Sequence, residues 1–165
     1  MDRGRPGGDR RRFLLFCSTQ VRDSFTIRAT MKQRSLPVAR RVRLRVLVAD
    51  DAVMNRSLAS RLLEEEGHVV SVATNGEHAI SELQDRKFDL VLMDVEMPVM
   101  NGIEATRAIR AREQSTGSRI PIIALTSTKC RDECLAAGMD AFLSKPLKVG
   151  ELRRVLKSMF GERAA

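Results

Sequence analysis

From Leu44 onward, apolar runs of strand length alternate with stretches of helical periodicity. The apolar runs are 44–49, 69–73, 88–93, 120–125 and 141–143. The helical stretches are 53–66, 77–85, 103–112 and 149–160, and the connection at 130–138 is short. Parallel strands need crossover connections, and strands buried on both faces read as continuous apolar runs. The pattern therefore predicts an α/β domain whose five-stranded parallel sheet is covered by helices on both faces. In the first helix, Met54, Leu58 and Leu62, with Leu63 one position on, stand at helical spacing.

Polar residues follow four of the predicted strands. They are Asp50 and Asp51 after the first strand, Asp94 after the third, Thr126 after the fourth, and Lys145 just after the fifth. Because ligands bind beyond the carboxyl ends of the strands in open parallel sheets, we expect these side chains to share one site. Three carboxylates repel one another unless a cation lies between them, and oxygen ligands suit Mg²⁺. Phosphate bridging that metal and the Lys145 ammonium would explain why acids and a base share the site.

Each of these residues also has an ordinary interpretation. An Asp at a strand end is commonly a turn former or a helix N-cap, and Asp51 could cap the helix that begins at Val53. Thr126 fits ordinary β-propensity, and Lys145-Pro146 fits a surface turn. Taken together, at one edge of one sheet, the residues favour a shared phosphate and metal site.

The polar strand ends belong to four longer segments, LRVLVADD (44–51), FDLVLMDVEMPVMNG (88–102), IPIIALTS (120–127) and AFLSKPL (141–147). Together these segments resemble the receiver domain of two-component response regulators, of the type attached to hybrid histidine kinases and multistep phosphorelays. The resemblance covers roughly residues 44–160. It implies a flavodoxin-like, doubly wound sheet with strand order 2-1-3-4-5.

The resemblance also implies a role for each site residue. It makes Asp94 the phosphoacceptor, and it makes the Mg²⁺ ligands Asp50, Asp51, Asp94 and the backbone carbonyl of Glu96. The phosphate-contacting and switch residues would be Thr126, Lys145 and Phe142, and the peptide bond between Lys145 and Pro146 would be cis. Asp94 would attack a phosphohistidine of a histidine kinase or histidine phosphotransfer protein, while Mg²⁺ and Lys145 neutralise the phosphoryl oxygens. Thr126 would then move toward these oxygens and Phe142 would rotate, switching a protein-binding face. Such a chain is a signalling phosphoacceptor rather than an enzyme, with only self-catalysed transfer and slow autodephosphorylation. The downstream target is not named by the sequence.

One departure from the family pattern leaves alternatives open. Only 19 positions separate Thr126 from Lys145, fewer than the family leads us to expect, and the shortening falls in the loop 127–132 and the helix after it. A pseudo-receiver that docks partners without a phosphorylation cycle is therefore the second hypothesis. A cofactor-binding flavodoxin-like domain would need a Gly-rich phosphate loop where DDAVMNR stands. A DNA-binding regulator has only the basic N-terminal segment in its favour.

The charge of the chain is concentrated in that N-terminal segment. Residues 1–45 hold 13 Lys or Arg against 3 Asp or Glu, whereas residues 46–165 hold 16 against 18. We expect a basic, disordered extension over 1–43, a receiver domain over 44–160 and a tail over 161–165. The extension could be a solvated segment, an organelle targeting peptide or a nucleic-acid-binding arm, although basic charge alone does not make nucleic acid an expected partner.

Hydropathy and cysteine usage indicate the compartment. No apolar run reaches the roughly 20 residues of a membrane-spanning helix, so no membrane contact is expected. Cys17, Cys130 and Cys134 form no even disulfide framework, which favours a reducing compartment. Cys130 and Cys134 lack the further ligands of a zinc site. We therefore expect a cytoplasmic protein, or an organellar one if 1–43 is a targeting peptide.

Overall fold

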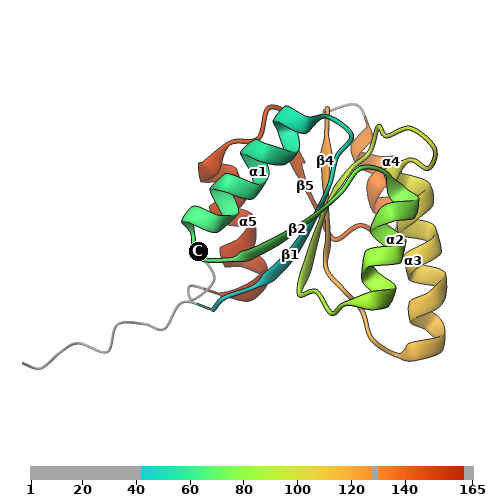
Figure 1. Cartoon of the computed structure of the whole chain (residues 1–165). Coiled ribbons are helices and arrows are strands. Elements are labelled where there is room, and N and C mark those ends of the chain that lie inside the picture. Colours follow the sequence, from blue (N-terminus) through green and yellow to red (C-terminus); the bar gives the residue numbers. More distant parts are fainter. Residues whose placement is uncertain (1–41, 128–129, 162–165) are drawn as a thin grey trace, which may run out of the picture. The chain divides into compact units, whose positions relative to one another are not determined.

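The computed structural model describes residues 42–127 and 130–161 (Figure 1). The expected N-terminal extension lies outside the described residues, apart from Val42 and Arg43. The expected tail also lies outside them, apart from Gly161.

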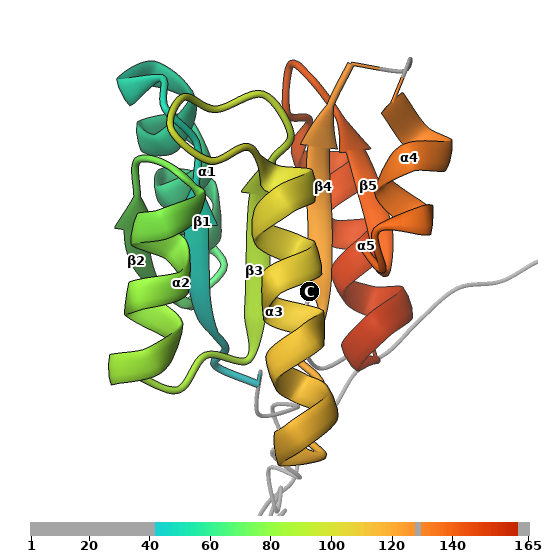
Figure 2. The same ribbon diagram turned by 90° about the vertical axis from the view of Figure 1, so that its right-hand side faces the viewer.

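Five parallel strands form one sheet, in the order β2-β1-β3-β4-β5 (Figure 2). The strands are β1 Arg45–Ala49, β2 Val69–Ala73, β3 Leu90–Asp94, β4 Ile122–Thr126 and β5 Ala141–Ser144. Every pairing is parallel, and the register aligns Ala49 of β1 with Met93 of β3. The predicted fold class and strand order are therefore confirmed.

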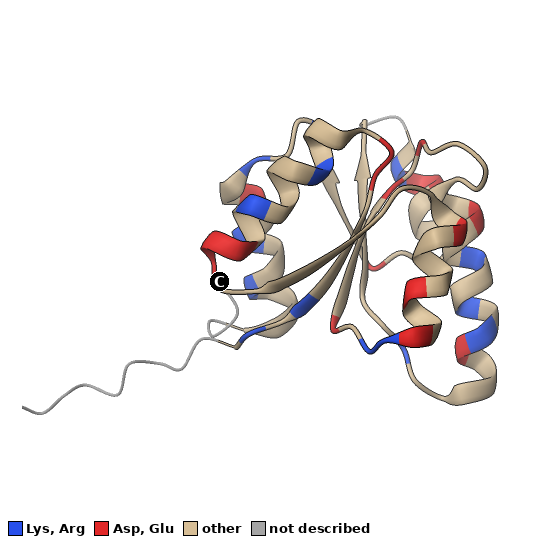
Figure 3. Cartoon of the chain, viewed as in Figure 1, with Lys and Arg blue, Asp and Glu red and all other residues tan. Residues whose placement is uncertain are grey.

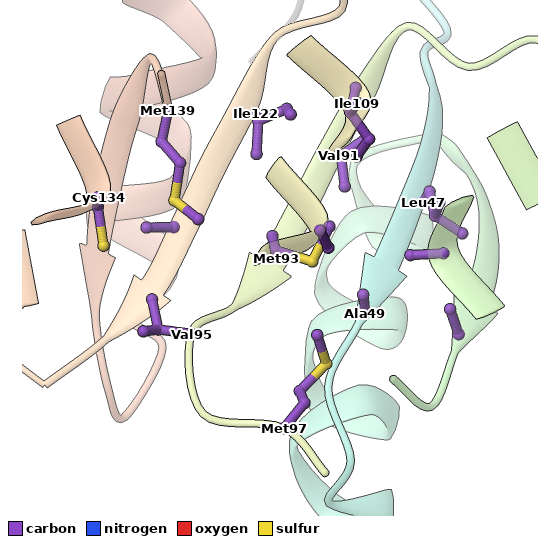
Figure 4. Packing of buried hydrophobic residues seen from close by; sticks show 14 residues of the cluster. Leu47, Ala49, Val91, Met93, Val95, Met97, Ile109, Ile122, Cys134 and Met139 are labelled. Atoms are coloured by element: carbon purple, nitrogen blue, oxygen red, sulfur yellow. The ribbon is translucent and has the colours of Figure 1, made fainter. Parts of the chain in front are cut away.

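Helices cover both faces of this sheet. They are α1 Val53–Glu65, α2 Gly76–Asp85, α3 Gly102–Thr116, α4 Arg131–Ala136 and α5 Val149–Phe160. Figure 1 shows α1 and α5 on one face and α2, α3 and α4 on the other. Each face buries its own apolar cluster, because strands enclosed on both sides direct alternate side chains to opposite cores. Figure 4 shows the cluster under α2, α3 and α4, with Met93, Val95 and Ile122 among its members.

Most element bounds lie within two residues of the predicted ones, and α3 is the exception. Its apolar periodicity ends at Ile109, but the helix continues through the polar residues to Thr116. A capping box between Asn101 and Glu104 opens the helix, and Gly117, with a left-handed φ of 69°, ends it. The polar extension went unpredicted because good helix formers need no apolar stripe to continue a helix already nucleated.

The predicted stripe of α1 is wrong in part. Met54 is 83% exposed and Leu58 is 43% exposed, whereas Ala59 and Leu63 are buried. The buried stripe therefore lies one position further along the helix than the leucine spacing indicated. A small residue, Ala59, completes it in place of a leucine.

The short fourth helix is held by α3. Helix α4 has six residues, lies beside β5 and buries Cys134 (Figure 2). The Arg110 guanidinium of α3 donates from Nε to the Gly138 carbonyl at 2.9 Å and from Nη2 to Asp140 Oδ2 at 2.8 Å. These charge-assisted bonds fix the end of the shortened connection where it returns to the sheet.

Among the described residues, no helix combines the length and the apolar character that crossing a bilayer would require.

Candidate functional site

The site is built first by the register of the two central strands. Asp50 directly follows Ala49 of β1, and Asp94 is the last residue of β3, one position after the Met93 that Ala49 faces. The backbone alone therefore places the two carboxylates side by side. Figure 3 shows acidic residues at the upper end of the sheet, where these strands stop.

A lysine lies between the two buried carboxylates. Lys145 Nζ is 2.6 Å from Asp94 Oδ2 and 3.1 Å from Asp50 Oδ2. The carboxylate side chains are 2% and 0% exposed, while the lysine is 31% exposed. The ammonium stabilises two charges that would be strongly destabilising if buried without a partner.

Burial dominates the protonation of the Asp94 carboxylate. Burial raises the pKa of Asp94, and the hydrogen bond and charge of Lys145 only partly offset this effect. Burial by itself would lower the pKa of Lys145, but the Asp94 and Asp50 carboxylates raise it above its ordinary value. The lysine therefore stays charged at neutral pH. A further cation beside the two carboxylates would stabilise their ionised form.

The same cluster offers a cation three carboxylates. One oxygen each from Asp50, Asp51 and Asp94 lie within 4.8 Å of one another, and Asp51 is exposed to solvent. Hard oxygen donors with one solvent-facing side fit Mg²⁺, which keeps several of its waters. Glu96 lies two residues after Asp94, and its amide donates to Asp94 Oδ1 at 3.2 Å.

The turn between β1 and α1 orients the acidic pair. Asp50 Oδ1 accepts from the Ala52 amide at 2.9 Å and from Asn55 Nδ2 at 3.2 Å. Arg56 Nη1 donates to the carbonyl oxygens of both Asp50 and Asp51, at 2.7 and 2.8 Å. The guanidinium therefore fixes the backbone that carries both acids.

Arg56 was missed by the sequence analysis. A cation near the positive N-terminal end of a helix is electrostatically unfavourable unless it has a specific partner, and that anomaly could have identified it. The N-cap of α1 is Ala52, whose side chain makes no capping bond, so the alternative that Asp51 caps this helix is wrong.

Gly102 lets α3 approach β3 closely. A Cβ at this position would stand 2.0 Å from the Asp94 carbonyl oxygen, and the Gly102 amide donates to the Val95 carbonyl at 3.0 Å. Only glycine fits this approach, because any side chain would overlap the backbone that carries Asp94.

The two predicted switch residues make other contacts. The Thr126 hydroxyl donates to the Ser127 carbonyl at 2.8 Å. Phe142 is half-buried against the cluster under α2, α3 and α4, and the Arg131 guanidinium lies 4.2 Å from its ring centroid. The peptide bond between Lys145 and Pro146 is cis. The structure thus brings together Asp50, Asp51, Asp94 and Lys145, with Thr126 and Phe142 in contacts of their own.

Comparison with known proteins gives this arrangement a family. The response regulator receiver domain model matches residues 46–157. The chain is 42% identical over 121 residues to the sensor protein GacS of Pseudomonas syringae pv. syringae, and the match covers 71% of this chain and 13% of that protein. It likewise spans only 15% of two plant histidine kinases, from Oryza sativa subsp. indica and Arabidopsis thaliana.

Solved structures agree with this result. The receiver domain of the sensor histidine kinase PA1611 from Pseudomonas aeruginosa PAO1 has a magnesium ion coordinated in its active site cleft. The chain matches it at 35% identity and a TM-score of 0.66, covering 73% of this chain and 100% of that one. The receiver domain of Ssk1, crystallised with the phosphotransfer protein Ypd1 of Saccharomyces cerevisiae, matches at 26% identity and a TM-score of 0.67, covering 71% and 88%. With its sheet order, its acidic edge and these matches, this chain belongs to the response regulator receiver domain family.

Proposed function

We propose that this chain accepts a phosphoryl group on Asp94 from a phosphohistidine of a histidine kinase or a histidine phosphotransfer protein. A carboxylate oxygen of Asp94 forms the new P–O bond, the P–N bond to the donor imidazole breaks, and the imidazole nitrogen leaves with the electron pair. The observation that carries the proposal is the contact of one ammonium with two buried carboxylates, beside a third carboxylate open to solvent.

Lys145 supports the transfer by its position. Its ammonium already lies 2.6 Å from the attacking carboxylate. It can therefore stabilise the negative charge that develops on the phosphoryl oxygens without a large movement of the side chain. Asp50, Asp51 and Asp94, with the Glu96 carbonyl, would hold Mg²⁺, which when bound supplies further charge neutralisation at those oxygens. Arg56 keeps the acidic pair in place through their carbonyls.

The donor class is supported by the relatives. The matched proteins include histidine kinases, and the yeast structure pairs a receiver domain with a phosphotransfer protein. On phosphorylation, the Thr126 hydroxyl would exchange the Ser127 carbonyl for a phosphoryl oxygen, and Phe142 would move away from Arg131. Both shifts would change the surface formed by α4, β5 and α5.

A mass measurement tests the proposal. The full chain is incubated with acetyl phosphate and Mg²⁺, and its intact mass should rise by one phosphoryl group. Asp94→Asn should abolish the gain, whereas Asp89→Asn, directly before the opposite end of the same strand, should leave it unchanged. A folded, Mg²⁺-binding protein that gains no mass would favour a docking module without a phosphorylation cycle.

Calorimetric titration with Mg²⁺ tests the ligand assignment separately. Asp51→Ala should weaken binding more than Asn55→Ala, because the carboxylate is a ligand and the amide only orients Asp50. Equal losses in the two variants would contradict the assignment.

A further inference from the structure

A second cleft opens at the end of the sheet opposite the acidic cluster. It has a volume of about 820 Å³ and lies among the starts of β1, β3 and β4 and the ends of α2, α3 and α5. Strand β3 separates the two sites, and its five residues span about 16 Å. The volume falls within the range of small-molecule pockets. We call this feature the basal cleft.

The floor of the basal cleft is apolar. Leu83, Phe88 and Ile120 belong to the side of the sheet under α2 and α3, and Phe160 comes from the end of α5 on the other side. All four are only partly buried. The cleft therefore offers apolar surface from both faces of the sheet, including two aromatic rings, which give large contact area at low entropic cost.

The rim of the basal cleft is basic. Its charged residues are the cations Arg43, Arg45, Arg86, Lys87, Arg112 and Arg119 and the acids Asp89 and Glu113. Three of the cations have carboxylate partners: Arg45 with Asp89 at 3.3 Å, Arg86 with Glu82 at 3.4 Å and Arg119 with Asp140 at 2.9 Å. Arg43, Lys87 and Arg112 form no ion pair with any residue that the structure describes.

The nearby helix ends account for part of this charge. The carboxyl ends of α2, α3 and α5 each carry about half a negative charge, which favours cations in their vicinity. Six cations stand against four acids once Glu82 and Asp140, the partners of Arg86 and Arg119, are counted, so the edge stays net positive. The surplus cations lie on three separate segments and are exposed. They are therefore spaced to meet several anionic groups along an extended ligand rather than one small anion.

We propose that the basal cleft binds a short acidic segment of a partner protein. Apolar side chains of that segment would pack on Phe88 and Phe160, and its carboxylates would lie near Arg43, Lys87 and Arg112. The proposal is independent of phosphoryl transfer at Asp94. The N-terminal segment of this chain is a poor occupant, because residues 1–41 hold 11 Lys or Arg against 3 Asp or Glu and would repel the rim.

Peptide selection on the full chain tests the proposal. A phage library of random short peptides is selected on the immobilised protein, with counter-selection on Lys87→Glu/Arg112→Glu. Enrichment of sequences that combine Asp or Glu with Leu or Phe would support the inference. Enrichment of basic or uncharged sequences, or no enrichment at all, would overturn it.

The selected peptide is then synthesised with a fluorescent label, and its affinity is measured by anisotropy. Charge reversal at Lys87 and Arg112 together should weaken binding about tenfold, and added salt should weaken binding of the peptide to the unaltered chain. Arg107→Glu is the matched control for Arg112→Glu alone, because Arg107 is also exposed on α3 but does not line the cleft, and binding should persist. Lys87→Gln/Arg112→Gln serves if the reversed variant does not fold. Equal loss in the control would mean that only overall charge matters.

Competing occupants are separated with the same assay. A peptide of residues 12–27 of this chain tests its own N-terminal segment, and a dT oligonucleotide tests nucleic acid. A version of the selected peptide with serine at its apolar positions tests the floor. Tighter binding of either competitor, or full affinity of the serine version, would refute an acidic and apolar peptide as the occupant.

Discussion

Gly102→Ala is the sharpest stability prediction, because rigid backbone occupies the space that a side chain at position 102 would need. The added Cβ would meet the Asp94 carbonyl oxygen at 2.0 Å, and its carbon and Met93 Cγ at 2.9 Å. Real Cβ contacts essentially never fall below 3.0 Å, so the two backbones must separate by about 1 Å. No flexible side chain can absorb the shift at the carbonyl.

The magnitude follows from two opposing effects. Overpacking a tight contact costs about 3 kcal/mol, whereas alanine gains up to about 1 kcal/mol over glycine in a helix. We therefore expect the free energy of unfolding to fall by about 2 to 3 kcal/mol, and the Tm by roughly 10 °C. The same 1 Å shift moves Asp94, so phosphorylation should slow by about 100-fold.

Urea unfolding followed by circular dichroism is the appropriate assay, because the chain has no Trp or Tyr for fluorescence. Gly150→Ala in α5 is the matched control, since its Cβ would meet nothing within 4 Å. That variant should be stabilised by about 0.5 to 1 kcal/mol. If Gly102→Ala unfolds within about 0.5 kcal/mol of the wild type, a spread expected of neutral surface changes, the close-approach argument is wrong.

Three further predictions concern other parts of the domain. Burial alone would raise the pKa of Asp89, but the hydrogen bonds from Arg45 hold this pKa below the ordinary 3.8. Ionised Asp89 therefore stabilises the fold above pH 3.8. In urea titrations, the stability difference between the wild type and Asp89→Asn should shrink as the pH falls below that value. Burial raises the pKa of the Cys134 thiol, so at pH 8 iodoacetamide should label Cys130 well before Cys134, as peptide masses will report. Val99 has a φ of 69° and is 74% exposed, so Val99→Gly should raise the free energy of unfolding by about 1 kcal/mol; a loss in urea titration would count against strain there.

The sheet could be predicted because its central strands carry their own signal. A run such as Leu90–Met93 is apolar at every position, which fits a strand buried on both faces, and its flanking helices forced a parallel arrangement. Helix α1 was harder to orient. Met54 and Leu58 are apolar but exposed, so the leucine spacing pointed to a face slightly displaced from the buried one.

The acidic edge was predictable because the carboxyl ends of parallel strands meet at one edge of the sheet, whichever side chains follow them. The contacts that support this edge could not be predicted. Arg56 acts on backbone carbonyls, and Thr126 donates to its own neighbour, so both contacts depend on turn geometry that residue types do not reveal. The close approach of Gly102 to the carbonyl oxygen of Asp94 is likewise a property of packing rather than of sequence spacing.

The shortness of α4 has a consequence for how different parts of the domain open. In a helix of six residues most amides precede the first internal partner, and one buried side chain anchors it. Its amide protons should therefore exchange with deuterium through small local openings, while those of fully buried β3 await rupture of the sheet. This difference in the free energy of opening would let α4 rearrange at little energetic cost while the carboxylate edge of the sheet keeps its geometry.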